Sequence, residues 1–136
     1  MTLIIDSSVA LSWCFEDERT DAALALFRRV AENGAIVPGI WNYEIANGLQ
    51  MAVVRGRIDK KYRDATLADF DKLSIVVDNE SGHQIWQRSM QLADKFHLTI
   101  YDATYLELAE RLNLSLATFD KALQKAAKTI GCALEK

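Results

Sequence analysis

The chain has 136 residues, a length that predicts a single domain over residues 1–136. Hydrophobic residues make up 50% of the chain and charged residues 26%, which excludes a disordered tail, a collagen-like fibre and a low-complexity linker. The net charge is −3, so any contact with nucleic acid must depend on local patches or on a metal ion rather than on bulk attraction.

The expected elements alternate between short apolar runs, which predict buried strands, and stretches with a helical period. In chain order they are strand 3–5, helix 7–15, a helix with its apolar stripe at 23–30 that ends at Asn33-Gly34, strand 35–37, a helix with its stripe at 41–52 that ends near Arg55-Gly56, helix 59–73, strand 75–77, helix 85–96, helix 102–112, strand 114–118 and helix 123–130. Residues 132–134 are a candidate for a last edge strand. Short apolar strands separated by helices predict an α/β fold in three layers, with a mainly parallel sheet covered by helices on both faces.

The cysteines and the N-terminus indicate the compartment. Cys14 and Cys132 are too few and too far apart for a disulfide framework or a zinc site, so we expect buried thiols in a reducing cytoplasm. The first residues lack the basic segment of a signal peptide, and Asp6 interrupts the apolar stretch. No apolar run approaches the ~20 residues that cross a bilayer. These features predict a soluble cytoplasmic protein.

Four carboxylates stand where an open parallel sheet binds its ligands, beyond the carboxyl ends of the strands. Asp6 ends the first strand, and Asp120 follows strand 114–118. Asp102 opens the helix before that strand, and Glu44 lies in the apolar helix after the second strand. We expect all four to converge on one edge of the sheet.

Three of the carboxylates also have an ordinary structural explanation. Asp6 and Asp120 can cap helices, and Asp102 can interact favourably with the positive end of a helix dipole. Glu44 is harder to explain, because a carboxylate on so apolar a helix needs solvent or a partner. Together, however, the four would repel one another, and a divalent cation such as Mg²⁺ would compensate them. The sequence contains no glycine-rich phosphate loop, nucleophile elbow or paired-cysteine motif. A carboxylate-only metal site favours phosphoryl chemistry.

Polar, basic and aromatic residues extend this prediction. Ser7 and Thr118 adjoin the predicted site, and Asn47 lies three residues after Glu44 on the same helical face. Substrate phosphates would need basic neighbours. The candidates are Arg28-Arg29, Arg55 with Arg57, Lys60-Lys61, and Lys121 with Lys125. The three tryptophans, Trp13, Trp41 and Trp86, are expected in the core or at an interface rather than as base-stacking platforms.

The chain resembles the PIN domain, in the form of the small stand-alone VapC-type toxin of a toxin–antitoxin pair. The resemblance covers nearly the whole chain and is carried by four motifs in order. They are the strand ending in Asp6-Ser7-Ser8, the segment from Pro38 through Trp41, Glu44, Asn47 and Leu49, the run Tyr101-Asp102-Ala103 followed by Tyr105-Leu106, and the run Ala117-Thr118-Phe119-Asp120 followed by Lys121 and Leu123.

The resemblance implies an endoribonuclease that depends on Mg²⁺ or Mn²⁺ and cleaves RNA with a metal-activated water. It implies an acidic catalytic and metal-binding quartet of Asp6, Glu44, Asp102 and Asp120, with Ser7, Asn47 and Thr118 as polar supporting residues. It also implies a homodimer and a cognate antitoxin whose tail enters the acidic groove.

Two other classes of function stay open at this point. One is a receiver-like phosphoacceptor, in which Asp78 after the third strand would accept the phosphoryl group. The other is a metal-free module that uses its acidic groove only to bind a basic peptide. Labelling of Asp78 as an acyl phosphate would favour the first, and binding without metal-dependent cleavage would favour the second.

Overall fold

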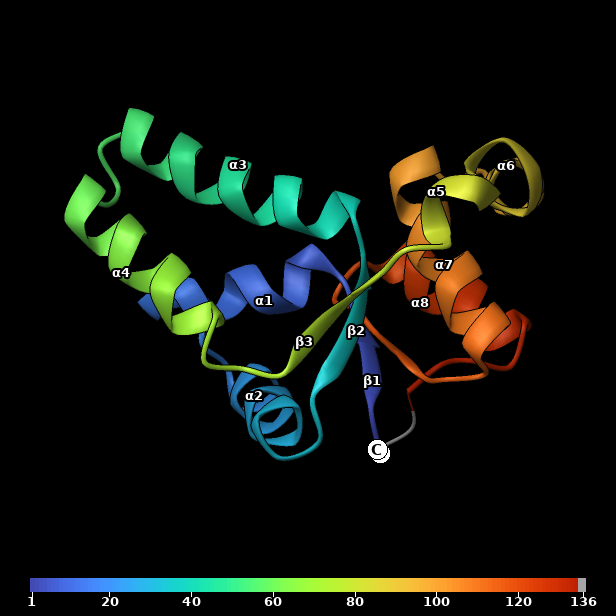
Figure 1. Ribbon diagram of the computed structural model, residues 1–136, viewed down its shortest axis with the longest axis horizontal. Coiled ribbons are helices and arrows are strands. Elements are labelled where there is room, and N and C mark those ends of the chain that lie inside the picture. The colour runs from blue at the N-terminus through green and yellow to red at the C-terminus, as the bar shows by residue number, and fades with distance from the viewer. Residues whose placement is uncertain (135–136) are drawn as a thin grey trace.

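The computed structural model describes residues 1–134 and contains a four-stranded parallel sheet between two layers of helices (Figure 1). The strands are β1 (Leu3–Ile5), β2 (Ala35–Pro38), β3 (Ile75–Asp78) and β4 (Leu116–Ala117). The helices are α1 (Ser7–Cys14), α2 (Asp21–Asn33), α3 (Ile40–Val54), α4 (Lys60–Phe70), α5 (Ser81–Gln84), α6 (Met90–Phe96), α7 (Ile100–Leu112) and α8 (Lys121–Thr129), with a 3₁₀ turn η1 (Glu16–Glu18) and a π-helical turn η2 (Ile85–Ser89). The predicted α/β class is confirmed.

The strand order β3-β2-β1-β4 places β1 and β2 in the middle of the sheet. In the register, Ile4 of β1 lies opposite Ile36 of β2 on one side and Leu116 of β4 on the other. All three residues of β1 are buried, as expected for a strand covered on both faces. Parallel pairing brings the carboxyl ends of the strands to one edge of the sheet.

The helices divide between the two faces. Helices α1 to α4 lie on one side of the sheet and α5 to α8 on the other (Figure 1). Helix α7 contacts β1, β2 and β4 and is the central helix of its layer, with Leu106 and Leu108 fully buried. The contacts of α1 with both α2 and α3 organise the opposite layer. No helix in the described residues is long and apolar enough to span a membrane.

Polar side chains start several of these helices. Asp6, Asp59, Thr99 and Asp120 each accept a hydrogen bond from the backbone N–H three residues further along, which satisfies a donor that the first helical turn leaves free. The capping that the sequence suggested for Asp6 and Asp120 is therefore confirmed. It does not exclude a second role for either carboxylate.

Several predicted boundaries were wrong. Strand 114–118 shortens to Leu116–Ala117, because Asn113 adopts a left-handed conformation with φ 54° and the Leu114 N–H bonds back to α7. Residues 132–134 form only an isolated bridge, between Leu116 and Ala133, rather than a strand. The predicted helix 59–73 begins after its cap Asp59 and ends at Phe70.

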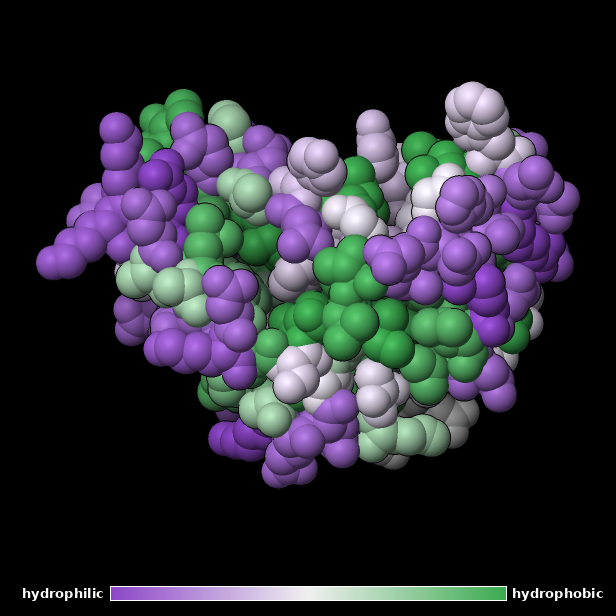
Figure 2. All heavy atoms as spheres, in the orientation of Figure 1, coloured by the Kyte–Doolittle hydropathy of each residue, from purple (hydrophilic) through white to green (hydrophobic). Residues whose placement is uncertain are grey.

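The predicted helix 85–96 contains a feature that its period did not indicate. Its first turn is the π-helical turn η2, which leaves Trp86 90% exposed, so this tryptophan is not a core residue. Trp41 is buried, and the Trp13 indole N–H donates to the Ala23 carbonyl, as expected of packed side chains. Figure 2 shows an apolar patch across the centre of one face, over the edge strand β3, where Val76 and Val77 are exposed.

Both cysteines are buried and free, as predicted. Burial raises the pKa of the Cys14 and Cys132 thiols to about 11. Because the thiolate is the reactive form, these side chains pack as small apolar groups rather than as nucleophiles.

Candidate active site

Asp6 is the most buried carboxylate of the predicted quartet, with 4% of its surface exposed. Its backbone leaves the central strand β1, and its side chain caps α1 through a 3.2 Å bond from the Val9 N–H to Oδ1. Two hydroxyls also donate to it, Ser8 at 2.6 Å and Thr118 at 2.5 Å. Burial raises the pKa of Asp6 in spite of these hydrogen bonds, which favour the charged form.

Thr118 and Ser8 join the end of β1 to the end of β4. The Thr118 hydroxyl donates to Asp6 and also accepts a 3.0 Å bond from the Asp120 N–H. The Ser8 hydroxyl accepts a 3.0 Å bond from the Phe119 N–H. The loop that carries Asp120 is thereby held against Asp6, across 114 positions of sequence. Thr118 thus contacts Asp6 directly, and so does Ser8, which belongs to the Asp6-Ser7-Ser8 motif but was not among the predicted supporting residues.

Glu44 is half-buried in the first turns of α3, and its partner lies on the opposite layer of helices. The buried Tyr105 hydroxyl of α7 donates to Glu44 Oε1 at 2.5 Å. Burial, together with this bond and the nearby charge of Asp6, raises the pKa of Tyr105. The tyrosine therefore stays protonated and holds the carboxylate in one position. The sequence predicted that Glu44 needs either solvent or a partner, and it did not identify the tyrosine as that partner.

Asp102 and Asp120 complete the predicted quartet. Asp102 is half-buried in the first turn of α7, and Asp120 is exposed at the start of α8. Burial and the charge of Asp120 raise the pKa of Asp102. The charge of Asp102 in turn contributes to the raised pKa of Asp6. Asp102 thus lies near enough to both Asp6 and Asp120 for its charge to interact with each of them.

Within residues 1–134, no basic side chain forms an ion pair with these four carboxylates, Asp6, Glu44, Asp102 and Asp120. Mutually repelling, unpaired oxygen ligands fit a divalent cation, which prefers hard oxygen donors. As the side chains are placed, however, no three acidic, histidine or cysteine groups in residues 1–134 lie close enough together to hold a metal ion. The metal site therefore stays a prediction.

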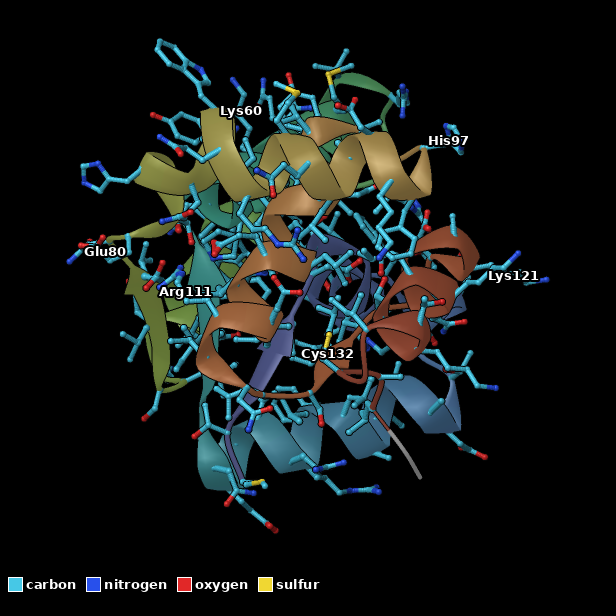
Figure 3. The ribbon with its side chains drawn as sticks, turned by 90° about the vertical axis from the view of Figure 1, so that its right-hand side faces the viewer. Lys60, Glu80, His97, Arg111, Lys121 and Cys132 are labelled. Atoms are coloured by element: carbon cyan, nitrogen blue, oxygen red, sulfur yellow. The ribbon has the colours of Figure 1, made fainter. Side chains whose placement is uncertain are left out.

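The other predicted residues differ in their surroundings. Ser7 is half-buried in the first turn of α1, and Asn47 is exposed on α3, one turn after Glu44. Lys121 extends into solvent from the first turn of α8, next to Asp120 in sequence (Figure 3). Arg57 lies elsewhere and pairs with Asp17 at 2.6 Å, so it is not free for a substrate.

Asp78, the candidate phosphoacceptor, has a structural role. Its carboxylate accepts bonds from the Arg111 guanidinium at 2.7 Å and from the Ser81 hydroxyl at 2.6 Å. Although burial alone would raise the pKa of Asp78, these bonds lower it. Arg111 also pairs with the buried Glu107 of its own helix, so its contact with Asp78 ties α7 to the end of β3. Both Asp78 oxygens are engaged, so the receiver-like alternative is not supported.

Comparison with known proteins identifies the family. The PIN domain family model matches residues 3–129, so the chain belongs to the PIN domain family. Among curated proteins, it is 26% identical to Ribonuclease VapC3 of Pyrobaculum aerophilum, over 90% of this chain and 92% of the relative. It is 28% identical to Ribonuclease VapC9 of Mycobacterium tuberculosis, over 89% of this chain and 87% of the relative.

The fold has a solved counterpart as well. The crystal structure of PAE2754 from Pyrobaculum aerophilum superimposes with a TM-score of 0.67 at 20% sequence identity. The match covers 98% of this chain and 88% of the other. The three-layer arrangement deduced from the strand and helix pattern is therefore shared by a solved protein.

Proposed function

We propose that this PIN domain protein is a metal-dependent endoribonuclease that acts as the toxin of a toxin–antitoxin pair. The observation that carries the proposal is the group of carboxylates at the carboxyl edge of the sheet, which have no basic partner among the described residues. The ribonuclease names of the relatives, which match along most of the chain, support the same reaction.

The residues divide into metal ligands and supports. Asp6, Asp102 and Asp120 would hold Mg²⁺ or Mn²⁺, and Glu44 would be a further ligand or would hold the attacking water. When bound, the ion would neutralise phosphate charge and activate water.

The chain's own contribution is to fix its oxygens before substrate arrives. Ser8 and Thr118 orient Asp6 from two sides, and Tyr105 holds Glu44. Ser7 and Asn47 would support the site by hydrogen bonding either to the substrate or to the carboxylates of the site. Such preorganised groups act without reorganisation during the reaction.

The proposed partners follow from charge and exposed apolar surface. An antitoxin with a basic segment would neutralise the acidic site and block RNA. A homodimer is supported by the edge strand β3, which exposes Val76 and Val77 and has an unpaired side in the described chain. The proposed location is the cytoplasm, where the protein would encounter both RNA and the antitoxin.

Incubation of the purified protein with total RNA, with Mg²⁺, Mn²⁺ or EDTA, tests the reaction. We expect cleavage with metal and none with EDTA. Asp120→Asn should abolish cleavage, because asparagine caps a helix about as well but is a poorer metal ligand. Asp59→Asn is the matched control, since Asp59 is also an exposed N-cap, accepting from the Tyr62 N–H at 2.8 Å, but lies outside the site. Cleavage by Asp120→Asn at the Asp59→Asn rate would contradict the proposal.

A further inference from the structure

The four tyrosines of the chain divide into two kinds. Tyr62 and Tyr105 are anchored, since their hydroxyls donate to the Cys14 carbonyl and to Glu44, each at 2.5 Å. Tyr43 and Tyr101 are 76% and 56% exposed, and neither hydroxyl bonds to the part of the chain that the structure describes. Packing therefore explains the first pair and leaves the second pair unexplained.

Each exposed tyrosine is the sequence neighbour of a carboxylate of the site. Tyr43 directly precedes Glu44 on α3, and Tyr101 directly precedes Asp102 in the first turn of α7. Tyr101 also lies four residues before Tyr105, on the same face of α7 and about 6 Å along its axis. Because Tyr105 contacts Glu44, the N-terminal halves of α3 and α7 meet there. The two exposed rings thus stand on the two helices that border the site.

The net negative charge of the protein requires a way to bind RNA that does not depend on an overall positive charge. An RNA-cutting site made of carboxylates, in a chain of net charge −3, gains no affinity from bulk attraction of phosphate, so local patches, a metal ion or uncharged contacts must supply it. Stacking of a base on an aromatic ring needs no positive charge, and any base can provide a face for it. A base can stack on a protein ring only when it is not already stacked in a duplex.

We infer that Tyr43 and Tyr101 are base-stacking platforms, which bind the unpaired bases beside the phosphate that is cleaved. This inference rests on the proposed ribonuclease function and adds two substrate-binding residues to it. The enzyme then takes RNA that is single-stranded at the cut and reads the bases by stacking, with little preference set by hydrogen bonds. Binding gained in this way depends only weakly on salt.

Fluorescence of a single-stranded oligoribonucleotide carrying 2-aminopurine tests the inference, because stacking on a tyrosine quenches the probe. Binding is measured in the Asp120→Asn background, so that the probe stays intact. We expect Tyr43→Leu and Tyr101→Leu each to weaken binding about tenfold and to reduce the quenching. Tyr43→Phe and Tyr101→Phe, which keep the ring, should restore both relative to leucine. The same probe in a duplex should bind weakly to every variant.

Phe27→Leu is the control, because Phe27 of α2 is also a partly exposed aromatic residue. Its ring packs on Trp13, which lies about 10 Å along α1 from Asp6 and so away from the site. This variant should bind like the parent. Leucine variants at Tyr43 and Tyr101 that bind and quench like the parent would overturn the inference. A wild-type protein that cleaves no RNA would instead defeat the proposed function, and the quenching data would still decide the role of the tyrosines.

Discussion

Replacing Tyr105 by phenylalanine removes one oxygen atom from the candidate site and leaves the buried ring in place. The lost interaction is the 2.5 Å hydrogen bond to Glu44 Oε1. A hydrogen bond to a charged group contributes about 1.5–3 kcal/mol, and because Glu44 is only half-buried, water can replace part of it, so about 1.5 kcal/mol is expected. For a chain of this size, that corresponds to a fall in Tm of about 5 °C.

The same substitution should slow RNA cleavage, because Glu44 loses the group that orients it. We expect kcat/KM to fall about tenfold, equivalent to about 1.4 kcal/mol of transition-state stabilisation. In a Glu44→Gln background the further effect of Tyr105→Phe should be much smaller, since the two residues act as a unit.

Tyr62→Phe is the matched control for this experiment. It also loses a 2.5 Å hydrogen bond, to the neutral Cys14 carbonyl, and should lose about 1 kcal/mol of stability without a change in cleavage. If Tyr105→Phe and Tyr62→Phe cleave RNA equally fast, the positioning of Glu44 by Tyr105 is refuted.

Three further predictions concern stability and reactivity. Arg111→Met leaves the buried Glu107 without its basic partner, so the free energy of unfolding measured by urea denaturation should fall by about 3–5 kcal/mol. A loss under about 1 kcal/mol would contradict this prediction. Burial raises the pKa of Asp6 above its ordinary value of 3.8, so the folded protein binds the carboxyl proton more tightly than the unfolded chain does. The free energy of unfolding therefore falls as the pH rises from 3.8 through the raised pKa. Without metal, the Tm of Asp6→Asn should therefore lie above that of the wild type at pH 7, and the difference should close near pH 4. A difference in Tm that stays constant with pH would contradict burial of the charged Asp6 as its cause. Cys14 and Cys132 should resist iodoacetamide at pH 8 until urea unfolds the chain.

The sequence predicted the sheet, and the elements from which the candidate carboxylates project, because both depend on local pattern. The run Leu3–Ile5 is short, apolar and followed by an aspartate, so strand, cap and sheet edge all follow from adjacent residues. Asp102 and Asp120 were located in the same way, from the helix and strand that each one adjoins. Helical period and strand burial arise from neighbours in sequence, and these the sequence displays directly.

What the sequence could not predict depends on contacts between distant segments. The bond from Tyr105 to Glu44 joins residues 61 positions apart, and Tyr105 fitted the apolar stripe of its helix equally well. The π-helical turn that exposes Trp86 leaves the apolar pattern of its helix almost unchanged. Pairing of Asp78 with Arg111 likewise became visible only when the end of β3 and the helix α7 were placed side by side.

Titration of Mn²⁺ into metal-free protein, followed by calorimetry, addresses the role of the carboxylates without any RNA. Wild type and the cap control Asp59→Asn should bind the ion with equal affinity, and Asp102→Asn should bind it at least tenfold more weakly while keeping its fold by circular dichroism. Equal binding by Asp102→Asn, or no binding by the wild-type protein, would contradict a metal site built from the acidic residues at this edge of the sheet.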